Sequence, residues 1–292
     1  MPELPEVEHV RRRLQRALAG HRITGVETRR QRLRGPLPAG FAARITGQTV
    51  GKVRRRAKYL VVELSGGDLL IVHLGMTGSF RVHTTPDAHS ASGSSGDGRH
   101  ATGAHDHVVF HLSTGARVVF NDPRRFGSMA LVPAAGADAS GPFQALGPEP
   151  LARGFSASDL VRSLRGRRTS IKAALLDQRV VAGLGNIYAA EALHHAGIAP
   201  ARRAGSLVTR DGEPRPELIA LADAIRLVLR RALAGKASYG GGNDRFRVYD
   251  REGLRCLRPG CGGVIERTMQ AGRSTFWCRR CQLQRGRPRH RR

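Results

Sequence analysis

The sequence predicts an α+β protein with an N-terminal antiparallel β-sandwich, a flanking helix, and a C-terminal helical domain that ends in a β-hairpin. Short apolar segments separated by turn residues occupy positions 23–132, which is the pattern of antiparallel strands. Beyond position 150 the apolar residues recur at helical spacing. All four cysteines fall between Cys256 and Cys281. The length of 292 residues suits about two domains.

The first helix is predicted to begin at Pro5, because proline costs least in the first turn of a helix. Its apolar face is formed by residues at helical spacing, Val7, Val10, Leu14, Ala17 and Leu18. Gly20 ends it. Glu6 and Glu8 lie in the first turn, where acids favour the helix dipole, and this accounts for both without a catalytic role.

Pro2 and Glu3 precede that helix and are not explained by it. Removal of Met1 would leave the ring nitrogen of Pro2 as the chain terminus, a secondary amine beside a carboxylate. Such a pair is suited to covalent attack on a carbonyl-type carbon.

The clearest strands are predicted at 59–64, 69–74, 108–112 and 116–120, joined in pairs by turns at 65–68 and 113–115. Residues 84–104 are rich in Ser, Gly, Asp and His and are predicted to form a surface loop. Lys58 stands at the start of a strand after three arginines, where a lone lysine would be a solvated or phosphate-contacting charge. The sandwich domain is assigned to 1–132.

Residues 133–150 are predicted to form a linker to a helical domain at 151–236. The expected helices there lie at 156–164, 171–176 and 186–195, followed by a longer one from Pro216 to Gly235. Gly183 and Gly185 allow a tight turn, and Asn186 is placed as an N-cap. Free N–H groups at that helix start would bind phosphate, so we expect a helix–two-turns–helix that clamps a nucleic-acid backbone.

The cysteines follow the spacing Cys256-x4-Cys261-x16-Cys278-x2-Cys281. Two close pairs on two turns can converge on one zinc ion, and four thiolates leave no open position, so the metal is structural. Four unrelated buried cysteines are the alternative, disfavoured because no cysteine lies elsewhere. We assign a zinc-finger hairpin to 247–284, with Arg273 near its tip, and a basic tail to 285–292.

The formal net charge is +26, from 49 Lys and Arg against 23 Asp and Glu. A surface this basic attracts polyanions, and nucleic acid is the commonest partner. No apolar run approaches the roughly 20 residues that span a bilayer. The N-terminus lacks the pattern of a secretory signal, so we expect an intracellular protein.

Two glycine-flanked loops present large side chains. The segment Asn121-Asp-Pro-Arg-Arg-Phe-Gly places cations beside Phe126, which could wedge into a base stack or fold back into the core. His73-Leu-Gly-Met-Thr-Gly similarly presents Met76.

Together these motifs resemble the formamidopyrimidine-DNA glycosylases and the related endonuclease VIII enzymes. The similarity covers nearly the whole chain and rests on six segments and the cysteine finger: Pro2-Glu-Leu-Pro-Glu-Val-Glu, Arg56-Ala-Lys-Tyr-Leu, His73-Leu-Gly-Met, Asp122-Pro-Arg-Arg-Phe-Gly, Leu146-Gly-Pro-Glu-Pro and Gly185-Asn-Ile-Tyr-Ala.

The resemblance implies that Pro2 attacks C1′ of a damaged nucleotide and forms a Schiff base, with Glu3 as proton donor. It implies proton transfer in β-elimination for Lys58, and δ-elimination with phosphate binding for Arg273. DNA-contacting positions are matched by His105, Arg124, Arg167, Lys172 and Asn186. Met76, Arg124 and Phe126 match the trio that fills the gap left by the flipped nucleotide.

The expected activity is that of a bifunctional DNA glycosylase/AP lyase that removes oxidised purines and nicks the strand by β,δ-elimination. Its expected partner is double-stranded DNA with oxidised bases or abasic sites, bound by a monomer in a bacterial-type cytoplasm and nucleoid. The alternatives are an endonuclease VIII-type enzyme for oxidised pyrimidines and a non-catalytic damaged-DNA-binding protein. Intact Pro2, Glu3, Lys58 and Arg273 argue against the latter.

Three departures from the family pattern bear on specificity. The first cysteine pair is separated by four residues where two are usual, and the 84–104 insertion is long. The segment at 236–247 is short where bacterial relatives carry a loop that closes over 8-oxoguanine. We therefore expect formamidopyrimidines and abasic sites to be processed at least as well as 8-oxoguanine.

Overall fold

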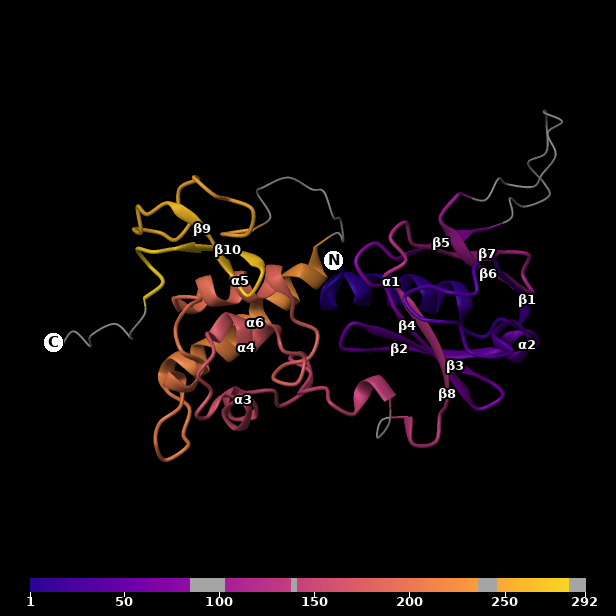
Figure 1. The fold of residues 1–292 in the computed structure, drawn as a ribbon, viewed down its shortest axis with the longest axis horizontal. Helices are drawn as coiled ribbons and strands as arrows, with labels where there is room; N and C mark the ends of the chain where they lie inside the picture. Colours follow the sequence, from indigo (N-terminus) through magenta and orange to yellow (C-terminus); the bar gives the residue numbers. More distant parts are fainter. Residues whose placement is uncertain (85–102, 138–140, 236–245, 284–292) are drawn as a thin grey trace. The chain divides into compact units, whose positions relative to one another are not determined.

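The structure is a computed structural model that describes residues 1–84, 103–137, 141–235 and 246–283 (Figure 1). The chain divides into two compact units. The first comprises Met1–Pro2 and Glu6–Phe143, and the second comprises Glu3–Pro5 and the chain from Gln144 onward. The expectations for the 84–104 insertion, the 236–247 loop and the 285–292 tail lie almost entirely outside the described residues.

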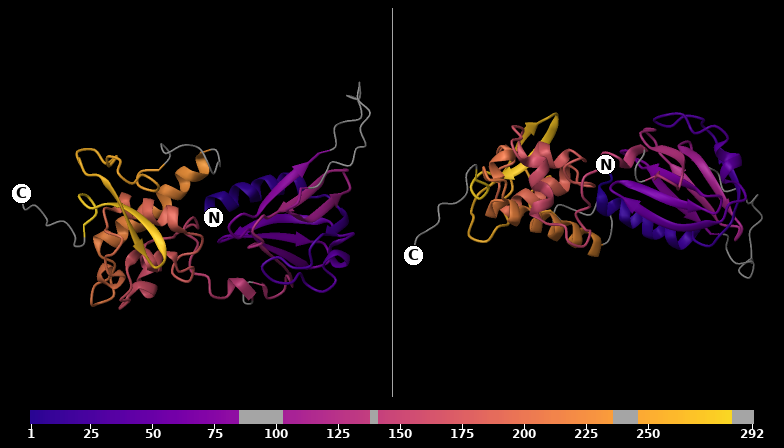
Figure 2. Two further views of the ribbon diagram at one scale, coloured as in Figure 1. Left: turned by 45° about the horizontal axis from the view of Figure 1, so that its top comes forward. Right: turned by 90° about the horizontal axis from the view of Figure 1, so that it is seen from below.

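The first unit contains two four-stranded antiparallel sheets (Figures 1 and 2). One sheet has the order β1 (Ile23–Thr28), β6 (Asp106–Leu112), β7 (Arg117–Asn121) and β5 (Ser79–His83). The other has the order β2 (Val50–Arg56), β3 (Tyr59–Leu64), β4 (Asp68–His73) and β8 (Ser128–Pro133). The predicted antiparallel architecture is confirmed.

A single apolar core lies between the two sheets. It takes buried residues from both, including Val62 and Val72 of one sheet and Phe110 and Phe120 of the other. Helix α1 (Leu4–Leu18) contributes its predicted apolar face, and the short helix α2 (Phe41–Ile45) contributes both of its terminal residues. The core thereby fixes the loops that leave the ends of β4 and β7.

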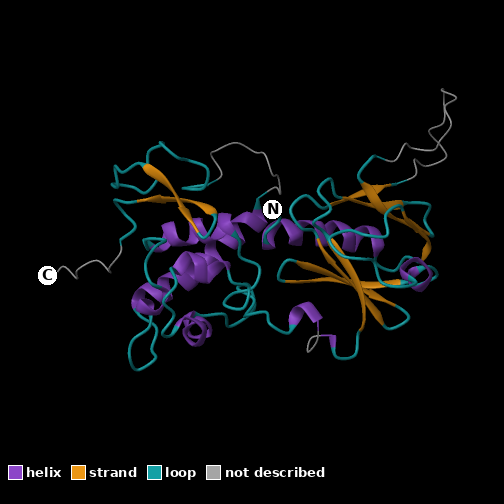
Figure 3. Ribbon diagram, in the orientation of Figure 1, coloured by secondary structure: helices purple, strands orange, loops and turns teal. Residues whose placement is uncertain are grey.

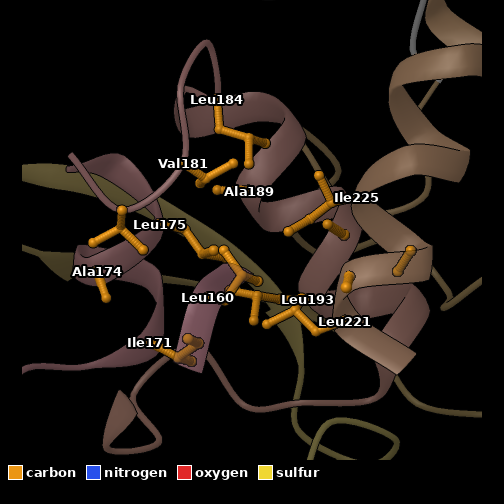
Figure 4. Packing of buried hydrophobic residues seen from close by; sticks show 14 of the residues in the cluster. Leu160, Ile171, Ala174, Leu175, Val181, Leu184, Ala189, Leu193, Leu221 and Ile225 are labelled. Carbon is orange, nitrogen blue, oxygen red and sulfur yellow. The ribbon is translucent and has the colours of Figure 1, made fainter. Parts of the chain in front are cut away.

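The second unit is mainly helical, as Figure 3 shows by the contrast with the strands of the first. Its helices are α3 (Ala157–Leu164), α4 (Ile171–Leu176), α5 (Asn186–Ala196) and α6 (Pro216–Ala234), with a short 3₁₀ helix η3 (Ala204–Leu207). Ser156 and Asp159 form a reciprocal capping box on α3. Apolar residues of α3, α4, α5 and α6 pack in one core, seen close up in Figure 4.

The C-terminal part of this unit is the predicted hairpin of β9 (Ile265–Gln270) and β10 (Arg273–Cys278). A buried carboxylate of α5 holds the chain that leads to it. Glu191 accepts backbone N–H bonds from Arg247, Val248 and Tyr249 at 2.9–3.1 Å. Burial raises the pKa of Glu191, and these donors oppose the rise. Sequence reasoning did not single this residue out.

No helix in the described ranges is long and apolar enough to cross a membrane.

Candidate functional site

The carboxylate of Glu3 occupies the N-terminus of α5. Glu3 is buried, and its two oxygens accept backbone N–H bonds from Gly185 (2.8 Å), Ile187 (2.8 Å) and Tyr188 (3.2 Å). A helix start leaves such N–H groups without intrahelical partners and favours negative charge. The prediction that these groups are free to bind phosphate is wrong, because Glu3 uses them.

Glycine is required at position 185 by this contact. A Cβ atom there would overlap the carboxyl group of Glu3. Gly185 is also the N-cap of α5, so the prediction that Asn186 caps the helix is wrong. Asn186 is the first helical residue instead, and its side-chain amide donates to the backbone oxygen of Ser274 at 3.0 Å. Pro2, half-buried, immediately precedes Glu3.

Lys172 of α4 binds the same backbone oxygen as Asn186. Its buried ammonium donates to Ser274 O at 2.9 Å and to Thr275 Oγ1 at 2.5 Å. Burial and the positive charge of Arg273 lower the pKa of Lys172 to about 8, while the charge of Glu3 opposes the shift. Two residues predicted to contact DNA therefore hold the hairpin strand beside Arg273, which is exposed at the start of β10.

Arg167 is half-buried and paired within the protein. Its guanidinium lies 2.9 Å from Asp177, which also binds Arg179 at 2.9 Å. Hydrogen bonds from Arg179, with help from Arg167, hold the pKa of Asp177 well below its usual range. The pair stabilises the turn between α4 and α5.

In the first unit, Met76 and Phe126 are each 41% exposed. The guanidinium of Arg124 lies over the Phe126 ring, 4.6 Å from its centroid. This cation–π contact orients the arginine along the aromatic ring. The alternative in which Phe126 folds back into the core is therefore wrong.

Asp122 links the loops that carry these residues, a role the sequence analysis missed. It is fully buried, and its carboxylate accepts from Gly127 N–H (2.7 Å) and Thr77 Oγ1 (2.5 Å). Gly75 packs against the backbone of Phe126 so closely that any side chain at 75 would overlap it. The only available signal was an aspartate that opens a turn after a strand.

Lys58 is buried in the turn between β2 and β3, directly after Ala57, whose φ is 52°. The expectation of a solvated charge for Lys58 is wrong. Nearby, the Nδ1 atom of His73 accepts the Gly75 N–H at 3.0 Å. Burial, with the charges of Lys58 and Arg34, lowers the pKa of His73 to about 4. Lys58 is thus a buried lysine whose charge acts on His73.

His105 is exposed, and its backbone oxygen accepts the N–H of Asp122 at 3.0 Å. It therefore adjoins the turn that carries Arg124.

The four cysteine thiols converge on one point. All four residues are buried, and their sulfur atoms lie within 4.8 Å of one another. The Cys256–Cys281 and Cys261–Cys278 sulfur distances are 3.8 and 3.6 Å. A tetrahedron with Zn–S bonds of about 2.3 Å has edges of about 3.8 Å, so the cluster fits one structural zinc ion.

Family models match three consecutive parts of the chain. The formamidopyrimidine-DNA glycosylase N-terminal domain matches residues 1–129, and the formamidopyrimidine-DNA glycosylase H2TH domain matches 146–241. The zinc finger found in FPG and IleRS matches 253–283. The chain belongs to the formamidopyrimidine-DNA glycosylase family. Members of this family are DNA-repair glycosylases with DNA-binding and zinc-finger domains.

Similar proteins support this membership over the full length. Formamidopyrimidine-DNA glycosylases of Rhodopseudomonas palustris strains TIE-1 and BisB18 are 51% and 53% identical, over 97% of this chain and 100% of theirs. The Lactococcus lactis enzyme in complex with abasic-site DNA is 31% identical with a TM-score of 0.81, over 96% of this chain and 99% of that one. MutM bound to DNA with carbocyclic 8-oxo-G gives a TM-score of 0.80, also at 31% identity and with the same coverage.

Proposed function

We propose that this chain is a bifunctional DNA glycosylase/AP lyase that releases oxidised purines from duplex DNA. The observation that carries the proposal is the buried, hydrogen-bonded carboxylate of Glu3 directly after Pro2. The names of its relatives and the DNA bound to its structural neighbours support the substrate class, which includes formamidopyrimidine and 8-oxoguanine.

Pro2 is proposed to act as the nucleophile once Met1 is removed. Its nitrogen forms a bond to C1′ while the glycosidic bond breaks. The electrons of the glycosidic bond leave with the base, which takes up a proton from water. A secondary amine condenses to an iminium that is cationic at any pH. Three backbone N–H donors hold the Glu3 carboxylate in place, and we propose that it receives a proton first. We infer that Glu3 passes the proton released by the Pro2 amine to O4′ of the sugar as the C1′–O4′ bond breaks, which opens the ring and leaves the iminium.

Strand cleavage follows from the same iminium. Its positive charge acidifies the C2′ protons, and loss of one of them expels the 3′ phosphate. A second elimination releases the 5′ phosphate, and water then frees Pro2 from the sugar fragment. Lys58 is proposed to transfer the proton in the first elimination. Arg273 is proposed to bind phosphate and assist the second.

DNA recognition is assigned to the two sets of side chains described above. Met76, Arg124 and Phe126 are proposed to fill the gap left by the flipped nucleotide, which their exposure supports. The remaining predicted contacts, His105, Arg167, Lys172 and Asn186, are proposed to bind the backbone. Lys172 and Asn186 would then exchange the Ser274 oxygen for a phosphate oxygen.

Excision from matched duplexes tests the substrate assignment. Duplexes with formamidopyrimidine, 8-oxoguanine, thymine glycol or an abasic site are compared under single-turnover conditions. We expect release of both purine lesions and nicks bearing phosphate at both ends. Preference for thymine glycol would replace the purine assignment with an endonuclease VIII-type one, and binding without base release would indicate a non-catalytic binder.

A further inference from the structure

The long loop between Cys256 and Cys261 is anchored on the C-terminal turn of α5. Arg258, inside this loop, donates to the backbone oxygens of His194 and His195, the latter at 3.1 Å. The last carbonyl groups of a helix have no intrahelical donors, and a cation is favourable there. The four residues between Cys256 and Cys261 thus include an arginine that caps the C-terminal end of α5.

His194, in that same turn, contacts a metal ligand. It is completely buried, and its Nε2 atom lies 3.3 Å from the sulfur of Cys256. A zinc-bound sulfur is a thiolate and can only accept, so Nε2 must carry the hydrogen. The other ring nitrogen, Nδ1, is buried with no hydrogen-bond partner among the described residues. Burying a nitrogen without a hydrogen-bond partner costs free energy of folding. The hydrogen bond from Nε2 to the Cys256 sulfur is therefore the interaction that a histidine provides at this position and an apolar side chain does not.

We propose that His194 is a positioning residue for the structural zinc. It donates to the Cys256 thiolate, and Arg258 fixes the end of α5 that carries it. The second cysteine pair is joined to the same region, since Gln282 accepts from Cys278 N–H (2.8 Å) and donates to the backbone oxygen of Ile198 (2.9 Å). Zinc binding and the C-terminal end of α5 therefore form one cooperative unit.

Zinc affinity of the full-length protein, measured by competition with a chromogenic chelator, tests the proposal. Loss of an outer hydrogen bond to a metal ligand lowers affinity about 10–100-fold, and we expect this for His194→Leu. His194→Gln should retain most of the affinity, because its Nε2 amide can reach the same sulfur. His195→Leu is the matched control, since no bond joins that side chain to a described cysteine.

The cobalt-substituted protein separates a bond to the thiolate from a general packing effect. We expect the thiolate-to-cobalt charge-transfer band to shift in His194→Leu and to return in His194→Gln. If His194→Leu does not fold, the zinc affinity and the cobalt spectrum of His194→Gln test the proposal by themselves. Retained affinity and spectrum support the proposal, whereas a tenfold loss or an altered spectrum contradicts it. Wild-type affinity and spectrum in a folded His194→Leu protein would also overturn it.

Arg258 is tested by the rate at which the chelator removes zinc. Arg258→Gln should release zinc faster, because its side chain no longer holds the end of α5 that carries His194. Arg279→Gln is the control, because Arg279 is exposed and pairs with Glu266 at the surface. Equal release rates for the two variants would contradict the role of Arg258.

Discussion

The carboxylate of Glu3 accepts a 2.8 Å hydrogen bond from the backbone N–H of Ile187, 184 positions along the chain. With the donors from Gly185 and Tyr188, this bond fixes the carboxylate in a buried position. A buried carboxylate that gains three backbone donors recovers much of the hydration it loses. The proposed acid–base group is therefore positioned by the start of α5, and the side chain has little freedom to move.

Glu3→Gln should abolish most base excision while leaving the protein folded. The amide cannot accept and release the proton, and general acid–base groups contribute about 10²–10⁴-fold. The NH₂ group of the new glutamine would also face backbone N–H donors. Because a donor cannot accept their hydrogen bonds, the variant should lose about 1–3 kcal/mol of folding free energy. Single-turnover excision and thermal unfolding measure the two effects. Glu8→Gln is the control, because Glu8 binds Arg11, Arg12 and Arg55 and should affect stability only.

Phe126→Ala should weaken binding to lesion-containing duplex by about 1–3 kcal/mol, the value of one base–aromatic stacking contact. Stability should change by less than about 0.5 kcal/mol, because the ring is exposed. Fluorescence from a base analogue opposite the lesion reports insertion. Ile219→Ala removes a comparably exposed side chain from α6 and should change neither quantity. Equal affinities for the two variants would refute the wedge role.

Lys172 should make DNA binding dependent on pH near 8. Its pKa is lowered to about 8, so the ammonium loses its proton as pH rises from 7 to 9. The proposed phosphate contact should then weaken, by about tenfold if one charge-assisted hydrogen bond is lost. Titrations at constant ionic strength measure this. Lys172→Met should bind more weakly at pH 7 and lack this pH dependence, and the same dependence in both proteins would exclude Lys172 as its source.

His73 should make the folded state less stable in mild acid. Its pKa falls from 6.5 to about 4 on folding, so the unfolded chain takes up the proton first as pH drops. The stabilisation is present above pH 6.5 and is lost between about 6.5 and 4, by up to about 3.5 kcal/mol at roughly 1.4 kcal/mol per pKa unit. His73→Asn keeps an acceptor for Gly75 N–H without titrating. Denaturant unfolding at several pH values should show a shallower acid loss for this variant, and an unchanged slope would contradict the assignment.

The sequence predicts the local elements well, because strand alternation, helix spacing and cysteine spacing are each encoded over a few residues. It fails where a partner is distant in the chain. Asn186 was expected to cap α5 over free N–H groups, but Gly185 takes that place because Glu3 must approach the backbone. Lys58 was expected in solvent and is buried. The exposure of Phe126 could not be decided either, since it depends on packing of its turn, which Asp122 holds, against Gly75 from another loop.

The central claim is that the nitrogen of Pro2 becomes covalently bonded to C1′ of the damaged nucleotide. Borohydride reduction during reaction with abasic-site DNA tests it most directly, using protein whose Met1 is shown by mass spectrometry to be removed. We predict a protein–DNA complex that survives denaturation, maps to Pro2, and is absent from Pro2→Gly and from protein with a blocked N-terminus. No trapped complex with the processed parent protein, or a cross-link that maps to a lysine, would contradict the account.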